Sequence, residues 1–486
     1  MDTIVNHPEA LAVIVALPIL GIVAKLFGAS LRRIAKWYLY VAVFAVVIVM
    51  NSIFFPFIGG KDYFFRFAVE LALIFFILAW AFEMREGEFA AHLRTVFKKP
   101  LVIAVSVFVL VFLLACLFAY DVHAAFWANY ERGEGGFQMI HYYLFFLLLA
   151  LLLRTDGDWK NIFKFSLVSA GLVILYGIGG SLTLSGFIGP WSGNANPPAG
   201  WLHKLIDTRF QGSLGNAAYV APYLMFAMFF AGYLWIKRKA KGAMGIWSHI
   251  GYGAVIFVLL FFFYLSQTRG ALLGFGLSLF VLVLYFIFAG RGSFRKWSLI
   301  ALILLVAAAG TVYSLRNSSL VQTLPGGRLL QISLSDSSAQ TRLWVWGEAW
   351  QGFLERPILG WGPENFTSVF DKYFNPNFFV PGQSTETWFD RAHSVYFDYL
   401  SETGILGLLA YLSIFVVFAW MFFSKKYRHE EASSAKTSSV VLRGIFLATP
   451  IAYLGQGVAI FDVLPMYLSL FLFLGFAYHY FYGQNN

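Results

Sequence analysis

Charged residues are scarce in this chain of 486 residues, at 12% of the composition, whereas hydrophobic residues make up 59%. A soluble globular domain carries about 25% charged residues, so the composition excludes that class of protein. Cysteine is nearly absent too, since Cys116 is the only one. A single thiol excludes an internal disulfide and a cysteine-based zinc cluster.

In place of charge, the chain has a series of apolar runs, each of about 20 residues, long enough to cross a bilayer core as a helix. We predict an all-α polytopic membrane protein with about 12–13 transmembrane helices. The predicted spans lie near residues 10–29, 37–58, 63–84, 101–120, 137–153, 162–182, 216–236, 246–266, 270–290, 297–315, 394–423, 440–461 and 464–483. The run at 394–423 is long for one span, so we expect a kink at Gly404 or Gly407.

Lysine and arginine alternate between the connections. Of the 35 basic residues, 22 lie in alternate short connections and only 6 in the others. Basic connections stay cytoplasmic, so we predict a cytoplasmic carboxyl terminus. The amino terminus, the 183–215 connection, the Arg269 junction and the loop 316–392 then face the periplasm or cell exterior. The net charge of +10 is thus explained by topology, and we expect membrane lipids but no nucleic acid as partners.

The loop 316–392 is the only long polar stretch, and it suggests a division into residues 1–200, 201–410 and 411–486: amino-terminal helices, a central region with the loop, and carboxyl-terminal helices. Within the loop, residues 340–354 predict an amphipathic helix on the membrane surface. Its apolar positions are Leu343, Trp346, Ala349, Trp350 and Phe353. We also predict a second short helix from Pro363 to Tyr373 and a mobile segment at 375–390.

Four outward-facing places carry arginines that could form an anion site: Arg209, Arg269, Arg342 and Arg391. Arg269 stands where two apolar runs meet with almost no loop, and a charge there is costly unless paired or hydrated. Guanidiniums facing one cavity bind phosphate well, and we expect backbone amides near Gly212, Gly215 and Gly270 to assist. The alternatives are snorkelling for Arg269, a solvated charge for Arg209 and a headgroup contact for Arg342.

His393 begins the helix after the loop, as a cap or as a base that accepts a proton from a hydroxyl. Asp398 and Glu402 lie about 140° and 180° around that helix from His393, so we expect them to pair with other groups, such as an arginine. Asp156-Gly-Asp158 resembles a metal-binding pattern of sugar transferases, but we interpret it as a loop without a metal. Arg66 and Glu70 are predicted to form an ion pair.

The chain resembles the O-antigen ligase and O-antigen polymerase superfamily over roughly residues 200–410. The resemblance lies in Arg209-Phe-Gln-Gly-Ser-Leu-Gly-Asn216, Gln-Thr-Arg269-Gly-Ala, Arg342-Leu-Trp-Val-Trp-Gly-Glu-Ala-Trp350, Pro357-Ile-Leu-Gly-Trp-Gly-Pro363 and Ala392-His393-Ser394-Val-Tyr with Glu402-Thr-Gly404-Ile-Leu-Gly407. It departs from the family at Ser394, where many members have asparagine.

The resemblance implies a membrane-embedded, GT-C-like glycosyltransferase at the outer face of a bacterial cytoplasmic membrane. Such an enzyme moves a glycan from an undecaprenyl-diphosphate donor to a hydroxyl of a glycan, lipid or protein acceptor, inverts the anomeric centre and needs no metal or cofactor. By position, His393 and Arg269 would be catalytic, with His393 activating the acceptor hydroxyl. The donor diphosphate would be bound by Arg269, Arg209, Arg342 and Arg391.

Two other functions fit the same residues. A transporter or flippase for an anionic lipid-linked saccharide would use the arginines for binding alone, although such proteins often show repeat halves, which this sequence lacks. A non-catalytic protein of envelope assembly is the other alternative. A transfer assay and a vesicle-crossing assay would separate these functions.

Overall fold

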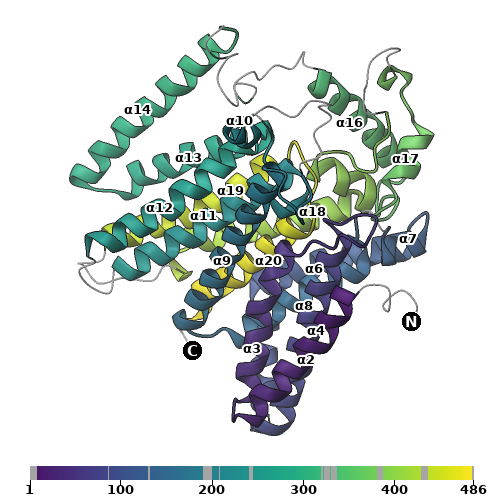
Figure 1. Ribbon diagram of the computed structural model, residues 1–486, viewed down its shortest axis with the longest axis vertical. Helices are drawn as coiled ribbons and strands as arrows, with labels where there is room; N and C mark the ends of the chain where they lie inside the picture. The colour runs from purple at the N-terminus through teal and green to yellow at the C-terminus, as the bar shows by residue number, and fades with distance from the viewer. Residues whose placement is uncertain are drawn as a thin grey trace.

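The computed structural model describes residues 8–85, 87–129, 132–189, 200–206, 208–239, 245–318, 321, 329, 337–379, 387–427 and 436–483. Its α-helices are α2 (Pro8–Leu26), α3 (Leu31–Ala42), α4 (Gly59–Glu83), α5 (Glu88–Phe97), α6 (Pro100–Leu117), α7 (Val122–Trp127), α8 (Gly136–Leu152), α9 (Asp156–Ser181), α10 (Trp201–Ile206), α11 (Ala217–Lys239), α12 (Ile246–Leu265), α13 (Arg269–Ala289), α14 (Gly292–Leu315), α16 (Ser337–Glu355), α17 (Phe366–Lys372), α18 (Val395–Phe423), α19 (Lys436–Gln456) and α20 (Leu464–Tyr482) (Figure 1). Short 3-10 helices are η1 (Val43–Val47), η2 (Gly212–Leu214), η4 (Pro376–Phe378) and η5 (Lys425–Tyr427).

The predicted membrane helices are largely confirmed. Among the described residues, ten helices are long and apolar enough to cross a membrane, and two shorter apolar helices lie at Val13–Leu26 and Gly136–Leu152. Twelve of the predicted spans therefore coincide with helices, and the chain is an all-α polytopic membrane protein.

The predicted span at 37–58 is wrong. Helix α3 ends at Ala42, η1 follows, and residues 48–58 form an irregular segment. Pro56 lies in this segment and its carbonyl accepts a hydrogen bond from the Met50 amide (3.0 Å). The helix has already ended at Val47, where Ile48 turns extended. Proline lacks an amide donor and disfavours a helix interior, so Pro56 opposes a new helix in the rest of the run.

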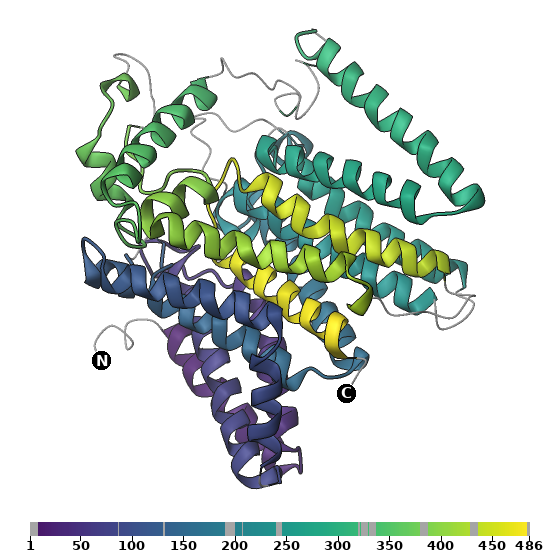
Figure 2. The same cartoon turned by 180° about the vertical axis from the view of Figure 1, so that it is seen from behind.

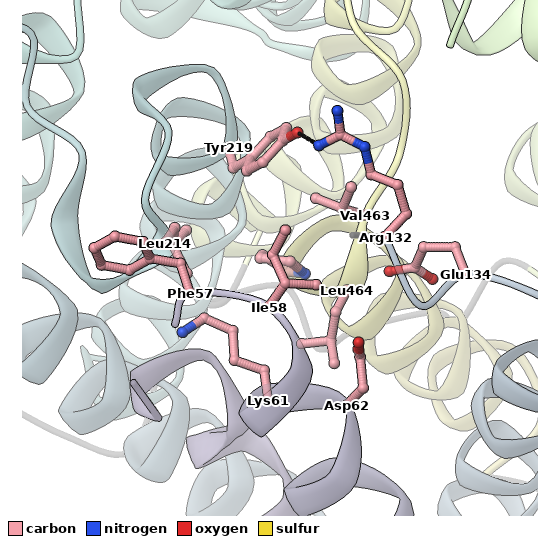
Figure 3. Close-up of a pocket in the computed structure, with 11 residues that line it drawn as sticks. Phe57, Ile58, Lys61, Asp62, Arg132, Glu134, Leu214, Tyr219, Val463 and Leu464 are labelled. Carbon is pink, nitrogen blue, oxygen red and sulfur yellow. Dashed lines mark hydrogen bonds between the residues drawn. The ribbon is translucent and has the colours of Figure 1, made fainter. Parts of the chain in front are cut away.

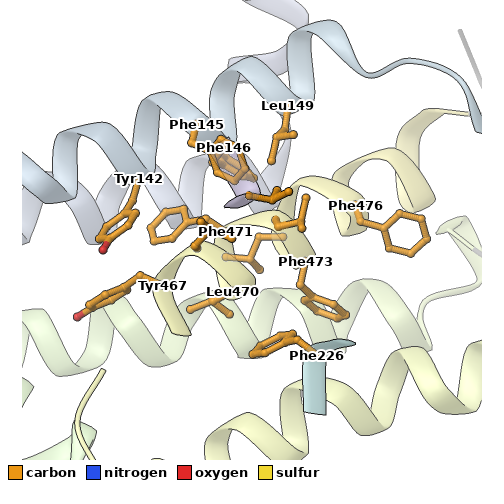
Figure 4. Packing of buried hydrophobic residues seen from close by; sticks show 14 of the residues in the cluster. Tyr142, Phe145, Phe146, Leu149, Phe226, Tyr467, Leu470, Phe471, Phe473 and Phe476 are labelled. Atoms are coloured by element: carbon orange, nitrogen blue, oxygen red, sulfur yellow. The ribbon is translucent and has the colours of Figure 1, made fainter. Parts of the chain in front are cut away.

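Helix α20 lies at the centre of the bundle, because nearly every side chain along it is buried. Figure 4 shows its aromatic side chains between α8 and α11. Phe471 stacks on Tyr142 at 5.8 Å between ring centroids, and Phe473 lies 6.2 Å from Phe226. Such aromatic pairs contribute about 0.5–1.5 kcal/mol beyond the area they bury, so the core fixes the helix that leads into the candidate site.

Helices α12, α13 and α14 differ from the buried helix α20, because most of their apolar surface is exposed. Helix α14 packs on α13 at one end and then diverges from the bundle (Figures 1 and 2). Leu299, Ile303 and Leu304 are exposed on it. A helix that is apolar all around and unburied fits a lipid environment.

Ion pairs join the helix ends predicted to share the cytoplasmic side. Lys36 Nζ lies 2.9 Å from Asp158 Oδ1, Lys237 Nζ lies 3.2 Å from Asp156 Oδ2, and His479 Nε2 lies 3.2 Å from Asp156 Oδ1. Asp158 also forms a capping box with Thr155 at the start of α9. The Asp156-Gly-Asp158 pattern thus has a structural explanation in helix capping and ion pairing.

The predicted Arg66–Glu70 ion pair is not formed. Arg66 instead donates to the Gly133 carbonyl (3.1 Å) and to Gln138, while Glu70 pairs with His141 (3.1 Å). Tertiary partners on α8 and the preceding loop replace the neighbour one helical turn away.

The loop 316–392 contains both predicted short helices, with changed details. In α16, Val345, Ala349 and Gly352 form the buried side, while Leu343 and Trp350 remain 51% and 45% exposed. The predicted apolar face is therefore divided between protein and surroundings. Helix α17 begins at Phe366 after Asn365, later than predicted from Pro363. Part of the segment predicted to be mobile, residues 380–386, lies outside the described residues.

Helix α18 is kinked at Gly404, as predicted, where φ is 63° and ψ is −167°. The kink leaves backbone amides and carbonyls of α18 without partners in the helix, and the loop supplies hydrogen bonds to them. The amides of Trp361 and Gly362 donate to the carbonyls of Ser401 (2.9 Å) and Glu402 (2.8 Å), and the Ile405 amide donates to the Pro357 carbonyl (2.9 Å). Broken backbone at membrane depth is tolerated only with such partners.

Candidate active site

Two loop segments bring Arg209 near the start of α13. The Phe210 amide donates to the Leu265 carbonyl (2.9 Å), and Thr268 Oγ1 donates to the Ala217 carbonyl (3.1 Å). Gln267 Nε2 adds a contact to the Ile206 carbonyl (3.4 Å). The segments that carry Arg209 and Arg269 therefore lie side by side, although they are separated by two helices in the sequence.

Arg269 is the first residue of α13, and the glycines after it set how closely α19 approaches. A Cβ added at Gly270 would lie 2.7 Å from Ala459 Cβ, and one at Gly274 would lie 2.5 Å from the Ala452 carbonyl oxygen. Gly270 thus permits helix packing, which corrects the expectation that it opens the backbone to an anion. Gly212 and Gly215 likewise face Val173 and Phe57.

The segment 457–463, between α19 and α20, links the Arg269 junction to His393. Ala459 contacts the Gly270 side. On the other side, the Val395 amide donates to the carbonyls of Gly457 (2.8 Å) and Ile460 (3.0 Å). The Phe461 ring then packs against the His393 imidazole. This segment therefore fixes Arg269 and His393 on either side of one short piece of chain.

His393 is half-buried and has a strained backbone conformation, with φ at 54°. Its Nδ1 lies 3.1 Å from the Arg391 carbonyl. Because a carbonyl only accepts, Nδ1 carries the proton and Nε2 keeps its lone pair. Burial lowers the pKa of His393 to about 4, and the charges of Arg342 and Arg132 act in the same direction. The imidazole is therefore neutral at pH 7 and able to accept a proton.

Arg342 reaches this region from α16. Four residues further along α16, Trp346 stacks on Phe397 of α18, with ring centroids 5.1 Å apart and planes at 15°. The positive charge of Arg342 acts on the pKa of His393. The structure thus brings Arg342 and His393 within electrostatic range, which their sequence positions alone did not require.

Arg391 is buried and engaged by carboxylates. Its Nη1 lies 2.9 Å from Glu402 Oε2, and its Nη2 pairs with Glu364. Asp398 Oδ1 accepts a 2.6 Å hydrogen bond from the Ala392 amide. The prediction that Asp398 and Glu402 serve groups other than His393 is confirmed. These pairs leave Arg391 less suited to a diphosphate than the sequence suggested, and better suited to holding the turn before His393.

Arg132 belongs to the same cluster and was not assigned a role from the sequence. Its Nη2 lies 2.9 Å from Asp390 Oδ1, its Nη1 donates to Tyr219 Oη (3.1 Å), and its guanidinium lies 5.0 Å from the Phe461 ring centre. Burial would raise the pKa of Asp390, but the hydrogen bond and charge of Arg132 outweigh it and lower that pKa. The available signal was that Arg132 lies in one of the few outward connections with a basic residue.

A small cavity lies beside Arg132 and Tyr219 (Figure 3). Lys61 and Asp62 of α4 border it, and Lys61 Nζ donates to the Ile48 carbonyl. Glu134 completes its charged lining, and burial raises the pKa of this carboxyl. Through Arg132, which pairs with Asp390, the cavity adjoins the cluster around His393.

Backbone strain gathers at this end of the molecule. Five non-glycine residues in the described part have positive φ, and four of them, Ala128, Gln267, Glu364 and His393, lie in the segments that form the cluster. Each such residue costs about 1–3 kcal/mol, and such strain tends to concentrate at functional sites. The distribution favours this cluster as the site of function.

Residues 254–412 match a family model described as O-Antigen ligase. A search of curated proteins found no match. The matched region runs from α12 to α18 and includes Arg269, Arg342, Arg391 and His393, whereas Arg209 and Arg132 precede it. The match supports a glycan-transfer role in the assembly of O-antigen or lipopolysaccharide. Over residues 254–412, the chain is therefore similar to the O-antigen ligase family.

Proposed function

We propose that this protein transfers a glycan from an undecaprenyl-diphosphate donor to an acceptor hydroxyl at the outer face of a bacterial cytoplasmic membrane. The observation that carries the proposal is the geometry at His393: its Nδ1 faces the Arg391 carbonyl at 3.1 Å, which leaves the lone pair on Nε2. A neutral imidazole with Nε2 free for a proton is what activation of a hydroxyl needs.

The donor diphosphate is assigned to the arginines at the helix junctions. Arg269 and Arg209 come from segments that are hydrogen-bonded to one another, and Arg342 lies near His393. Guanidiniums hold phosphate oxygens bidentately and remain charged at all relevant pH values. Fixed in place, they stabilise the charge that develops on the departing diphosphate, which is the role a metal ion has in other transferases.

The reaction is a single displacement. The acceptor oxygen attacks the anomeric carbon as the bond from that carbon to the diphosphate oxygen breaks. The bonding electron pair leaves with undecaprenyl diphosphate, and the hydroxyl proton passes to Nε2 of His393 and then to water. Attack opposite to the leaving group inverts the anomeric centre. Arg391 positions the base, since its own backbone carbonyl orients Nδ1.

Reconstituted protein tests the proposal. Purified chain in phosphatidylcholine liposomes receives an undecaprenyl-diphosphate oligosaccharide, a panel of glycan, lipid and peptide acceptors, and a chelator. We expect transfer with inverted stereochemistry. His393→Ala and Arg269→Ala should lose at least about 100-fold in rate. Arg295→Ala, an exposed arginine at the start of α14, is the matched control and should keep full activity.

Three results would count against the proposal. Full transfer by both site variants would remove the assigned roles. Transfer that stops in chelator would assign the charge stabilisation to a metal. Movement of intact donor across the vesicle membrane without any glycoside product would favour a transporter.

A further inference from the structure

A second polar groove lies at the opposite end of the bundle from His393, between α3 and α9. Its lining from α3 and the residue that caps it is Ser30, Arg32, Arg33, Lys36, Trp37 and Tyr40, and from α9 it is Asp158, Asn161 and Phe165. Its volume is about 550 Å³. Ligand pockets are commonly about 300–1,000 Å³, so the groove is large enough for a lipid head group.

The charges in this groove do not cancel. Lys36 Nζ lies 2.9 Å from both oxygens of Asp158, so these two groups neutralise each other. The guanidiniums of Arg32 and Arg33 make no hydrogen bond or ion pair within the described part of the chain. The nearby carboxylate of Glu83 is engaged by the Leu31 and Arg32 amides and by Lys25. Two positive charges thus remain available at the mouth of the groove.

Aromatic side chains form the apolar wall next to these charges. Trp37 is 53% exposed and meets Phe165 edge-on, with ring centroids 5.9 Å apart. Tyr40 stacks on Phe165 at 5.5 Å. Tryptophan and tyrosine are favoured at the level of lipid head groups. Guanidiniums beside an exposed aromatic wall suit a ligand with a phosphate at one end and acyl chains at the other.

We propose that the α3–α9 groove binds the phosphate of an anionic phospholipid through Arg32 and Arg33, with the glycerol and upper acyl chains against Trp37 and Phe165. Basic pockets between transmembrane helices are a known means of holding anionic head groups. This site is separate from the proposed transfer chemistry, because the ion pair of Asp156 with His479 places the start of α9 at the far end of α20 from His393.

Native mass spectrometry of the full-length purified protein tests the site directly. The protein is titrated with phosphatidylglycerol and, separately, with phosphatidylcholine. We expect preferential retention of phosphatidylglycerol, and a loss of about tenfold or more in its affinity in the Arg32→Gln/Arg33→Gln variant, given roughly 1 kcal/mol for each basic residue at a membrane surface. The matched control, Arg295→Gln/Lys296→Gln, removes the same charge from the exposed start of α14 and should retain wild-type affinity.

Two further measurements distinguish binding of a lipid from binding of a soluble phosphate. Glycerol 1-phosphate should compete only weakly with phosphatidylglycerol, and Trp37→Ala should weaken lipid binding while leaving any binding of glycerol 1-phosphate unchanged. Equal lipid affinity in the groove variant and in the control would overturn the site. Glycerol 1-phosphate binding as tightly as the lipid would overturn the assignment of the lipid. Thermal unfolding of each variant establishes that the fold is retained, and no transfer assay enters the test.

Discussion

The His393 imidazole meets the Phe461 ring edge-on, with centroids 5.1 Å apart and planes at 88°. The guanidiniums of Arg132 and Arg391 lie 5.0 and 6.0 Å from the centre of the same ring. The face of an aromatic ring attracts cations. Phe461 is therefore the common support that sets how far the candidate base lies from the positive charges around it.

Replacing this support should damage the reaction more than the fold. We expect Phe461→Leu to lower kcat at least about tenfold, because a shift of the imidazole by a fraction of an ångström disturbs the reacting geometry, at a cost in unfolding free energy of roughly 1 kcal/mol. Phe473→Leu removes a ring from the core next to Phe226 and serves as the control. Equal losses of kcat in both variants would contradict a positioning role for Phe461.

The pH dependence of transfer should reflect the lowered pKa of His393. Because protonation removes the lone pair of Nε2, kcat/KM should stay constant from about pH 6 to pH 8 and fall only as the pH approaches the pKa of about 4. Removing a nearby positive charge favours the protonated imidazole, so Arg342→Gln should move this acid limb to higher pH. An acid limb near pH 6.5 in the wild type, or no movement in Arg342→Gln, would contradict this account.

Arg391 should prove structural. Its guanidinium contacts Glu364 and Glu402 inside the protein, and removing one partner of a buried ion pair costs about 3–5 kcal/mol. We expect Arg391→Met to lower the melting temperature sharply in detergent, and Glu402→Gln to do so less, because Arg391 keeps Glu364. A well-folded Arg391→Met protein that has lost donor affinity would instead make Arg391 a ligand of the diphosphate.

The kink of α18 should depend on Gly404. At φ of 63° a side chain is strained, and an added Cβ would meet the Ile358 carbonyl. We expect Gly404→Ala to destabilise the protein by about 1–3 kcal/mol or more. Gly276→Ala in α13 is the control, since its Cβ would meet nothing within 4 Å and alanine favours a helix by about 1 kcal/mol. Thermal unfolding distinguishes the two, and equal melting temperatures would show that the kink tolerates a side chain.

The sequence predicted those features that depend on local pattern. Apolar runs located twelve of the helices, and the helical rotation between His393 and Glu402 correctly separated their roles. The sequence-based prediction failed where tertiary contacts determine whether a segment is helical. The run at 37–58 is apolar enough for a span, but the backbone turns extended at Ile48, after η1, and no helix resumes before α4.

The candidate site shows the same division. Arg269 stands out in the sequence because it lies between two apolar runs with almost no loop. Arg132 does not stand out in this way, because its role depends on an ion pair with Asp390, which is 258 positions away in the sequence. The buried side of α16 was also not predictable, since helical spacing gives a periodicity without saying which neighbour each face meets.

The hydrogen bonds that tie Trp361 and Gly362 to the broken turn of α18 have a mechanical consequence. This part of the polar loop cannot move away from α18 without breaking the hydrogen bonds at the kink of that helix. We therefore expect a long lipid-borne donor to enter laterally, between helices and from within the bilayer.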